Sequence, residues 1–111
     1  MRRAARRDEN HREIKGVFEA LDCSVLDVAG IPCGFDLIVG YKTQAICVEV
    51  KDGAKPPSAQ KLTPNEFSAH LNWRGPKAIV KNNDEAVAVA KLLRRRHFAV
   101  MESLNADLLG S

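Results

Sequence analysis

Apolar residues recur along the chain with two different periods. Three stretches have the three- and four-residue spacing of an amphipathic helix: one that begins near Asp8 or Asn10 and runs to Leu21, one from Thr63 to Trp73, and one from Glu85 to Arg96. Four shorter stretches are typical of strands and cover Ser24–Ala29, Phe35–Gly40, Gln44–Lys51 and Lys77–Lys81. The predicted order is therefore α-β-β-β-α-β-α, followed by a C-terminal tail (97–111) with only a weak tendency to form a helix.

The start of the second predicted helix carries a recognisable capping signal. Thr63 is followed by Pro64 and, three positions after the threonine, by Glu66. A threonine hydroxyl can accept a hydrogen bond from the backbone of the third helical residue, whose carboxylate bonds back to the cap. Proline is favoured at the first helical position. This pattern predicts a helix that begins at Pro64.

Length and composition indicate one globular domain. The chain has 111 residues, of which 45% are hydrophobic and 28% are charged, and its formal net charge is +3. So small a charge does not by itself indicate a nucleic-acid partner. No apolar run approaches the length of a membrane span, and three cysteines without a secretory signal favour a reducing, cytoplasmic setting. Residues 1–7 are expected to form a flexible basic arm.

The most informative segment is the predicted hairpin of Phe35–Gly40 and Gln44–Lys51. A turn centred between Lys42 and Thr43 places Asp36 directly opposite Glu49. Side chains two residues apart on a strand share a face, so Lys51 lies beside Glu49. Two carboxylates and a lysine thus converge on strands that otherwise consist mostly of valine, isoleucine and leucine.

Facing carboxylates destabilise a strand pair unless something compensates their charge. A divalent cation is the natural partner, because Mg²⁺ prefers oxygen ligands and commonly uses one or two carboxylates. Such an ion polarises a phosphodiester and activates water, and Lys51 would stabilise the charge that develops on the phosphate. The alternative interpretation is a solvated strand face, with Asp36 at its edge.

These residues also resemble a known family. An aspartate-bearing strand, a hairpin and then Glu49-Val50-Lys51, between a preceding and a following helix, is similar to the PD-(D/E)XK nuclease superfamily, and in particular to small phage and bacterial VRR-NUC-like or Holliday-junction-resolvase-like nucleases. The resemblance extends over nearly the whole chain and includes the downstream QKLTPNE and Trp-Arg-Gly stretches. Phe35 stands where the family name has proline.

The resemblance implies a fold and a set of site residues. The fold would be α/β: a single-domain restriction-endonuclease-like core (1–111) with a central mixed sheet flanked by helices. The metal ligands would be Asp36, Glu49, the carbonyl of Val50 and an acidic residue of the first helix, for which Glu13 is the first choice and Glu9 the second. Lys51 would be the catalytic lysine, and Gln60 a polar residue beside the metal. Mg²⁺, or Mn²⁺ in its place, would be the cofactor.

Basic residues near this segment are the candidates for phosphate contacts. Lys55 and Lys61 follow the site directly, Arg74 follows the second helix, and Arg6 and Arg7 belong to the arm. The run Arg94–Arg96 is typical of a solvated helix end, where the helix dipole favours cations.

The resemblance implies a metal-dependent DNA endonuclease. Its substrate would be double-stranded or branched DNA, such as a Holliday junction, and it would act as a homodimer in the cytoplasm of a bacterium or a phage-infected host. The alternative is a catalytically inactive nucleic-acid-binding module that keeps the nuclease fold.

Overall fold

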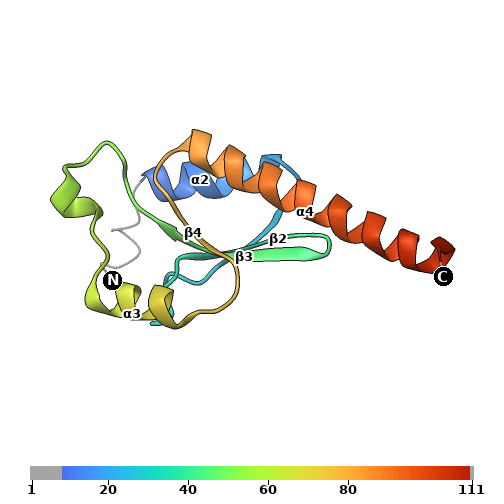
Figure 1. Cartoon of the computed structure of the whole chain (residues 1–111). Helices are drawn as coiled ribbons and strands as arrows, with labels where there is room; N and C mark the ends of the chain where they lie inside the picture. Colours follow the sequence, from blue (N-terminus) through green and yellow to red (C-terminus); the bar gives the residue numbers. More distant parts are fainter. Residues whose placement is uncertain (1–8, 111) are drawn as a thin grey trace.

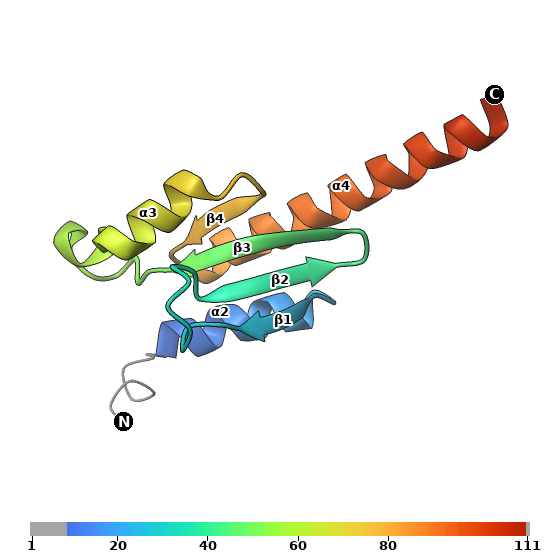
Figure 2. The ribbon, with the colours of Figure 1, turned by 90° about the horizontal axis from the view of Figure 1, so that it is seen from below.

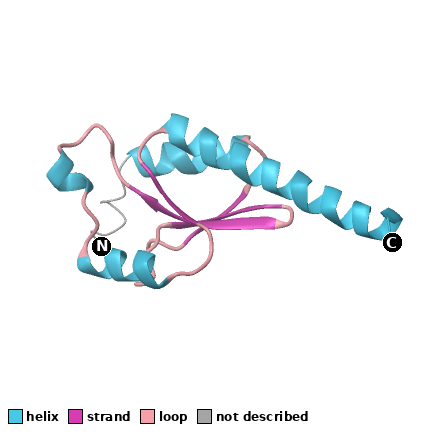
Figure 3. Ribbon diagram, viewed as in Figure 1, coloured by secondary structure: helices cyan, strands magenta, loops and turns pink. Residues whose placement is uncertain are grey.

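The computed structural model describes residues 9–110, apart from the side chain of Glu9, and shows a mixed α/β fold (Figure 1). Its elements in chain order are α2 (Glu9–Ala20), β1 (Ser24–Asp27), β2 (Leu37–Tyr41), β3 (Gln44–Val50), the short 3₁₀ helix η1 (Pro57–Gln60), α3 (Pro64–Asn72), β4 (Lys77–Val80) and α4 (Asn83–Gly110). Figure 3 shows how loops separate them. The predicted order of helices and strands is confirmed. The basic arm predicted for residues 1–7 lies outside the described residues.

The four strands form one mixed sheet in the order β1-β2-β3-β4. β1 pairs with β2 and β2 with β3 in antiparallel fashion, whereas β4 lies parallel to β3. In the central hairpin Leu37 faces Val48 and Tyr41 faces Gln44, so the turn lies at Lys42 and Thr43. The register predicted from the sequence is confirmed, and β3 is an inner strand.

Helices cover both faces of the sheet. α2 and α4 lie side by side on one face and α3 lies on the other, as the two orthogonal views agree (Figures 1 and 2). The core under α2 and α4 consists of fully or almost fully buried residues, among them Ile14, Phe18, Leu37, Val39, Val48, Val80 and Leu93. Alternation along β3 therefore sends Ile46 and Val48 into this core and sends Cys47 and Glu49 toward α3.

The capping signal before α3 forms as predicted. The Thr63 hydroxyl accepts a hydrogen bond from the Glu66 backbone N–H at 3.2 Å, and the Glu66 carboxylate accepts one from the Thr63 N–H at 2.8 Å. These reciprocal bonds satisfy two backbone donors that the first turn of a helix leaves open. They also set the direction in which the Glu66 side chain points.

The expectation of a weakly helical tail after His97 is wrong. α4 continues to Gly110, although its last buried residue is His97. The segment after His97 contains no proline and no glycine before Gly110, and alanine, leucine and methionine are strong helix formers. A helix already nucleated on the sheet therefore extends without further tertiary contact. No helix within residues 9–110 is both long enough and apolar enough to cross a bilayer.

Candidate active site

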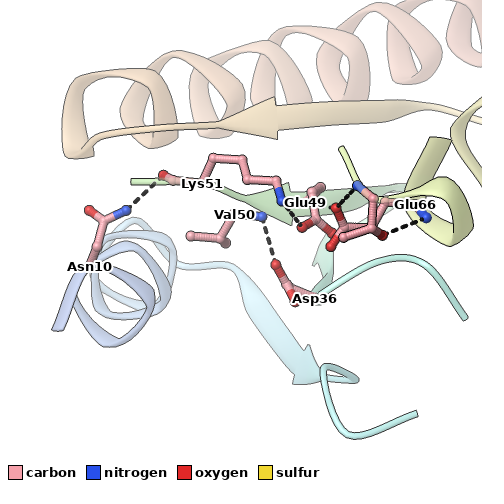
Figure 4. A network of polar contacts seen from close by, with 7 residues as sticks. Asn10, Asp36, Glu49, Val50, Lys51 and Glu66 are labelled. Atoms are coloured by element: carbon pink, nitrogen blue, oxygen red, sulfur yellow. Dashed lines mark hydrogen bonds and ion pairs between the residues drawn. The ribbon is translucent and has the colours of Figure 1, made fainter. Parts of the chain in front are cut away.

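The site lies at the end of the β2–β3 hairpin that is far from its turn. Asp36 immediately precedes β2, Glu49 is the second-last residue of β3, and Lys51 directly follows β3. Figure 4 shows their side chains together with Glu66 from α3 and Asn10 from α2. Four separate elements thus contribute to one polar cluster at the edge of the core.

Asp36 is held by the backbone of the neighbouring strand. Its carboxylate Oδ2 accepts a hydrogen bond from the Val50 N–H at 2.9 Å, and its own N–H donates to the Val48 carbonyl at 2.9 Å. The regular ladder ends one pair earlier, at Leu37 and Val48, so Asp36 approaches Glu49 from just beyond the strand instead of as a regular cross-strand pair. The other carboxylate oxygen of Asp36 has no part in this bond to Val50.

Glu49 is the buried acid of the site. Only 2% of its surface is exposed, so its carboxyl group is almost without water. This burial, together with the negative charge of Asp36 and a hydrogen bond and charge from Glu66, raises the pKa of Glu49 to about 9. Without a cation, Glu49 therefore carries a proton at neutral pH.

Lys51 is held between two acids. Its ammonium group donates to Glu66 Oε1 at 2.8 Å and lies 3.6 Å from Glu49 Oε2. Burial acts to lower the pKa of Lys51, but the hydrogen bond and charge of Glu66 and the charge of Glu49 outweigh it, and the net shift is upward. Lys51 therefore stays a cation, with its position set by α3.

Glu66 is the site residue that sequence reasoning assigned only to helix capping. Burial acts to raise its pKa, but the hydrogen bonds from Lys51 and the Thr63 N–H outweigh that effect and lower it. Glu66 is thus an anion that caps α3 and binds Lys51 with the same oxygen. The capping motif in the sequence marks Glu66, but only the packing of α3 against β3 brings it to Lys51.

The three acids share one hollow of about 160 Å³. Asp36, Glu49 and Glu66 all line it, as do Thr63 and Asn65 at the start of α3. The hollow is polar and open enough to admit an ion, water or a phosphate group.

Gly34 makes this close approach of loop and helix possible. It adopts a φ of +88°, and a Cβ at this position would lie 2.2 Å from the Ala69 Cβ. Any other residue would meet both a strained backbone and a steric clash with α3. Gly34 thereby sets the path of the chain that leads into Asp36.

Two other predicted site residues lie elsewhere. Glu13 is exposed on α2 and does not line the hollow. The Gln60 side chain donates to the carbonyls of Lys55 and Gly53, so it closes its own loop instead of facing the acids. The side chain of Glu9 lies outside the described residues. The α2 residue that reaches this end of the sheet is Asn10, whose amide donates to the Lys51 carbonyl at 2.8 Å.

The basic candidates lie outside the hollow. Lys55, Lys61 and Arg74 are exposed, and none of them lines the hollow. Arg6 and Arg7 lie outside the described residues.

The donor set of the hollow fits a hard divalent cation. Its candidate ligands are oxygens: the carboxylates of Asp36 and Glu49, and the backbone carbonyl of Val50, which follows Glu49 in the chain. Within residues 9–110, no three histidine, cysteine or acidic side chains form a complete set of metal ligands. Mg²⁺ commonly takes one or two carboxylates and fills the rest of its shell with water and substrate phosphate, so a two-carboxylate site suits it.

A buried neutral Glu49 beside Asp36 also fits an ion. A cation would favour the charged form of Glu49 and compensate for its loss of hydration.

Comparison with protein-family models, with curated protein sequences and with solved structures finds no match to this chain. The function is therefore inferred from the residues of the chain itself.

Proposed function

We propose that this protein is a divalent-metal-dependent endodeoxyribonuclease of the PD-(D/E)XK type. The observation that carries the proposal is the convergence of Asp36, Glu49 and Lys51 on one end of the hairpin, with Glu49 almost fully buried. A protein gains no stability from a protonated acid and a lysine buried together next to an apolar core. Such an arrangement is characteristic of a functional site.

The architecture supports the same proposal. The order α-β-β-β-α-β, a mixed sheet with helices on both faces, and an acid-bearing hairpin at its centre are the features that the resemblance implies for a restriction-endonuclease-like core. The hollow lies at the end of β3 beside α3, and Asp36, Glu49 and Glu66 all line it. Fold alone does not define an activity, so the site residues carry the argument.

Each residue of the site has a distinct role in this proposal. Asp36 and Glu49 would hold Mg²⁺ or Mn²⁺, with the Val50 carbonyl as a further ligand. When bound, the ion polarises the scissile phosphate and lowers the pKa of an attacking water. Lys51, whose ammonium group lies 3.6 Å from Glu49 Oε2, would stabilise negative charge that develops on the phosphate. Glu66 fixes the direction of the Lys51 side chain through the 2.8 Å ion pair.

The substrate class follows from the surroundings of the hollow. Lys55, Lys61 and Arg74 offer exposed positive charge, which suits a nucleic-acid backbone. These contacts would position the substrate without reading its sequence. We propose double-stranded DNA with a branch, such as a four-way junction, as the preferred substrate.

The proposal is tested by cleavage of a DNA panel that contains a four-way junction, a flap and a plain duplex, with Mg²⁺ or with EDTA. We expect Mg²⁺-dependent cleavage that falls at least about a hundredfold in Lys51→Ala and in Glu49→Gln. The matched controls are Lys15→Ala and Glu19→Gln, both on α2, neither of which lines the hollow. Cleavage by the two site variants at the wild-type rate would refute the proposed mechanism.

One observation favours the alternative of an inactive DNA-binding module. The helix residue that reaches the site is Asn10, which has no negative charge, whereas an acid was expected from α2. In that case the protein would bind DNA in a salt-dependent manner and leave it intact with every divalent metal. Binding measured beside cleavage separates the two functions.

A further inference from the structure

The C-terminal part of α4 projects beyond the rest of the molecule. α4 has 28 residues and is therefore about 42 Å long, and the molecule extends 56 Å along its longest axis. Both orthogonal views show α4 continuing past the turn of the hairpin (Figures 1 and 2). His97 is the last buried residue of the helix, and we call residues 98–110 the overhang.

The overhang carries an apolar stripe. Phe98, Met101, Leu104 and Leu108 recur at the spacing of one helix face, and their exposed fractions are 49%, 36%, 49% and 80%. Leu109 beside them is 87% exposed. Spacing of three and four residues is also the pattern by which two helices pack against each other.

Charge along this segment is divided into two blocks. Arg94, Arg95 and Arg96 directly precede His97 and the overhang, and the segment after Arg96 holds Glu102 and Asp107 with no lysine or arginine up to Gly110. Two such helices side by side in the same direction would place arginines against arginines. In the opposite direction, the arginines of one helix meet the acids of the other. The segment is therefore complementary to a second copy of itself.

A hollow next to the overhang suits the exposed leucines. It has a volume of about 270 Å³ and is lined by Leu21, Ala90, Lys91 and Arg94. Arg94 and Leu108 lie equally far from Met101 along the helix, on opposite sides of it. A two-fold axis at Met101 therefore brings Leu108 of a second copy over this hollow, with Asp107 of that copy near the level of Arg94.

We propose that α4 is a homodimer interface in which two copies pair antiparallel through the overhang. Met101 lies at the two-fold axis, Phe98 faces Leu104 of the other copy, and Leu108 enters the hollow of the other copy. Arg96 and Asp107 lie on the same flank of the helix and almost opposite each other about an axis at Met101, so they attract each other across the interface. Closed two-fold pairing buries both stripes and leaves no open edge for further assembly. This interface is independent of the proposed nuclease activity.

Sedimentation equilibrium of the full chain tests the interface directly. We expect wild-type protein to approach twice the monomer mass of 12.2 kDa as its concentration rises. Met101→Glu and Leu108→Glu should each weaken dimerisation at least about tenfold, because each places two charges in the apolar contact. The matched control is Leu71→Glu on α3, where the leucine is 70% exposed. Circular dichroism of each variant verifies that the helices remain folded.

A charge exchange tests the antiparallel direction. Arg96→Glu and Asp107→Arg should each weaken the dimer about fivefold, since every substitution occurs in both copies, and the double variant should restore it. A chain that stays monomeric at its highest attainable concentration overturns the proposal. A dimer that persists in both Met101→Glu and Leu108→Glu, or one that dissociates in Leu71→Glu, also overturns the proposal, because either result places the contact elsewhere.

Discussion

Replacement of Glu49 by glutamine is the sharpest test of the buried acid. Glutamine keeps the shape of the side chain and its ability to donate a hydrogen bond, but it has no proton to lose. Glu49 is 2% exposed, and its pKa in the folded protein is about 9, against an ordinary value of 4.5. The two proteins should therefore differ in how their stability changes with pH.

The sign of this difference follows from proton binding. Between pH 4.5 and about 9 the folded protein keeps the proton on Glu49 and the unfolded chain releases it. The free energy of unfolding of the wild type then falls as pH rises, by up to about 1.4 kcal/mol per pH unit relative to Glu49→Gln. From pH 5 to pH 7 we expect the stability advantage of Glu49→Gln to grow by about 2.5 kcal/mol.

Urea unfolding at pH 5, 6 and 7, in EDTA and followed by circular dichroism, measures this difference. His70, whose pKa burial lowers, titrates in both proteins, so its contribution cancels. Glu19→Gln on α2 is the matched control, because water hydrates that exposed carboxylate and its replacement should have a much smaller effect. Addition of Mg²⁺ should stabilise the wild type more than Glu49→Gln, since a cation favours the charged carboxylate.

A stability difference that does not change with pH would refute the reasoning, because it would mean that Glu49 is already ionised in the folded protein. A difference that shrinks as pH rises would show that the ionised form is stabilised by folding. Either result would remove the need for a compensating cation.

Two further pairs of substitutions test the structure around the hollow. Gly34→Ala should lower the free energy of unfolding by about 2 kcal/mol or more, because it strains the backbone and clashes with Ala69, whereas Gly16→Ala, with open space around it in α2, should raise it by about 1 kcal/mol. Equal effects of the two would contradict the assigned path of the loop. Thr63→Ala should reduce stability by about 1 kcal/mol through the lost cap, and Glu66→Ala by about 2 to 3 kcal/mol, because it also leaves Lys51 without its closest partner. Urea unfolding measures both, and an equal loss in the two would show that the Lys51–Glu66 pair adds nothing.

The order of the elements and the register of the hairpin were predictable because they depend on local sequence. A two-residue turn at Lys42 and Thr43 determines which residues of β2 and β3 face each other. The capping box at Thr63 and Glu66 likewise needs only residues three positions apart. The prediction of α4 was too short, although the apolar spacing of Phe98, Met101, Leu104 and Leu108 continues the helical pattern beyond its last buried residue, His97.

The membership of the site required the tertiary structure. The sequence by itself places Asp36 near Glu49 and Lys51, since one hairpin carries all three. It does not show that α3 packs over β3 and brings Glu66 to Lys51, or that Gln60 turns away into its loop. The elevated pKa of Glu49 is also a tertiary property, because it arises from burial under a helix that lies distant in the chain. Local spacing along the hairpin determined that two carboxylates and a lysine lie together, and long-range packing decided which other side chains join them in the site.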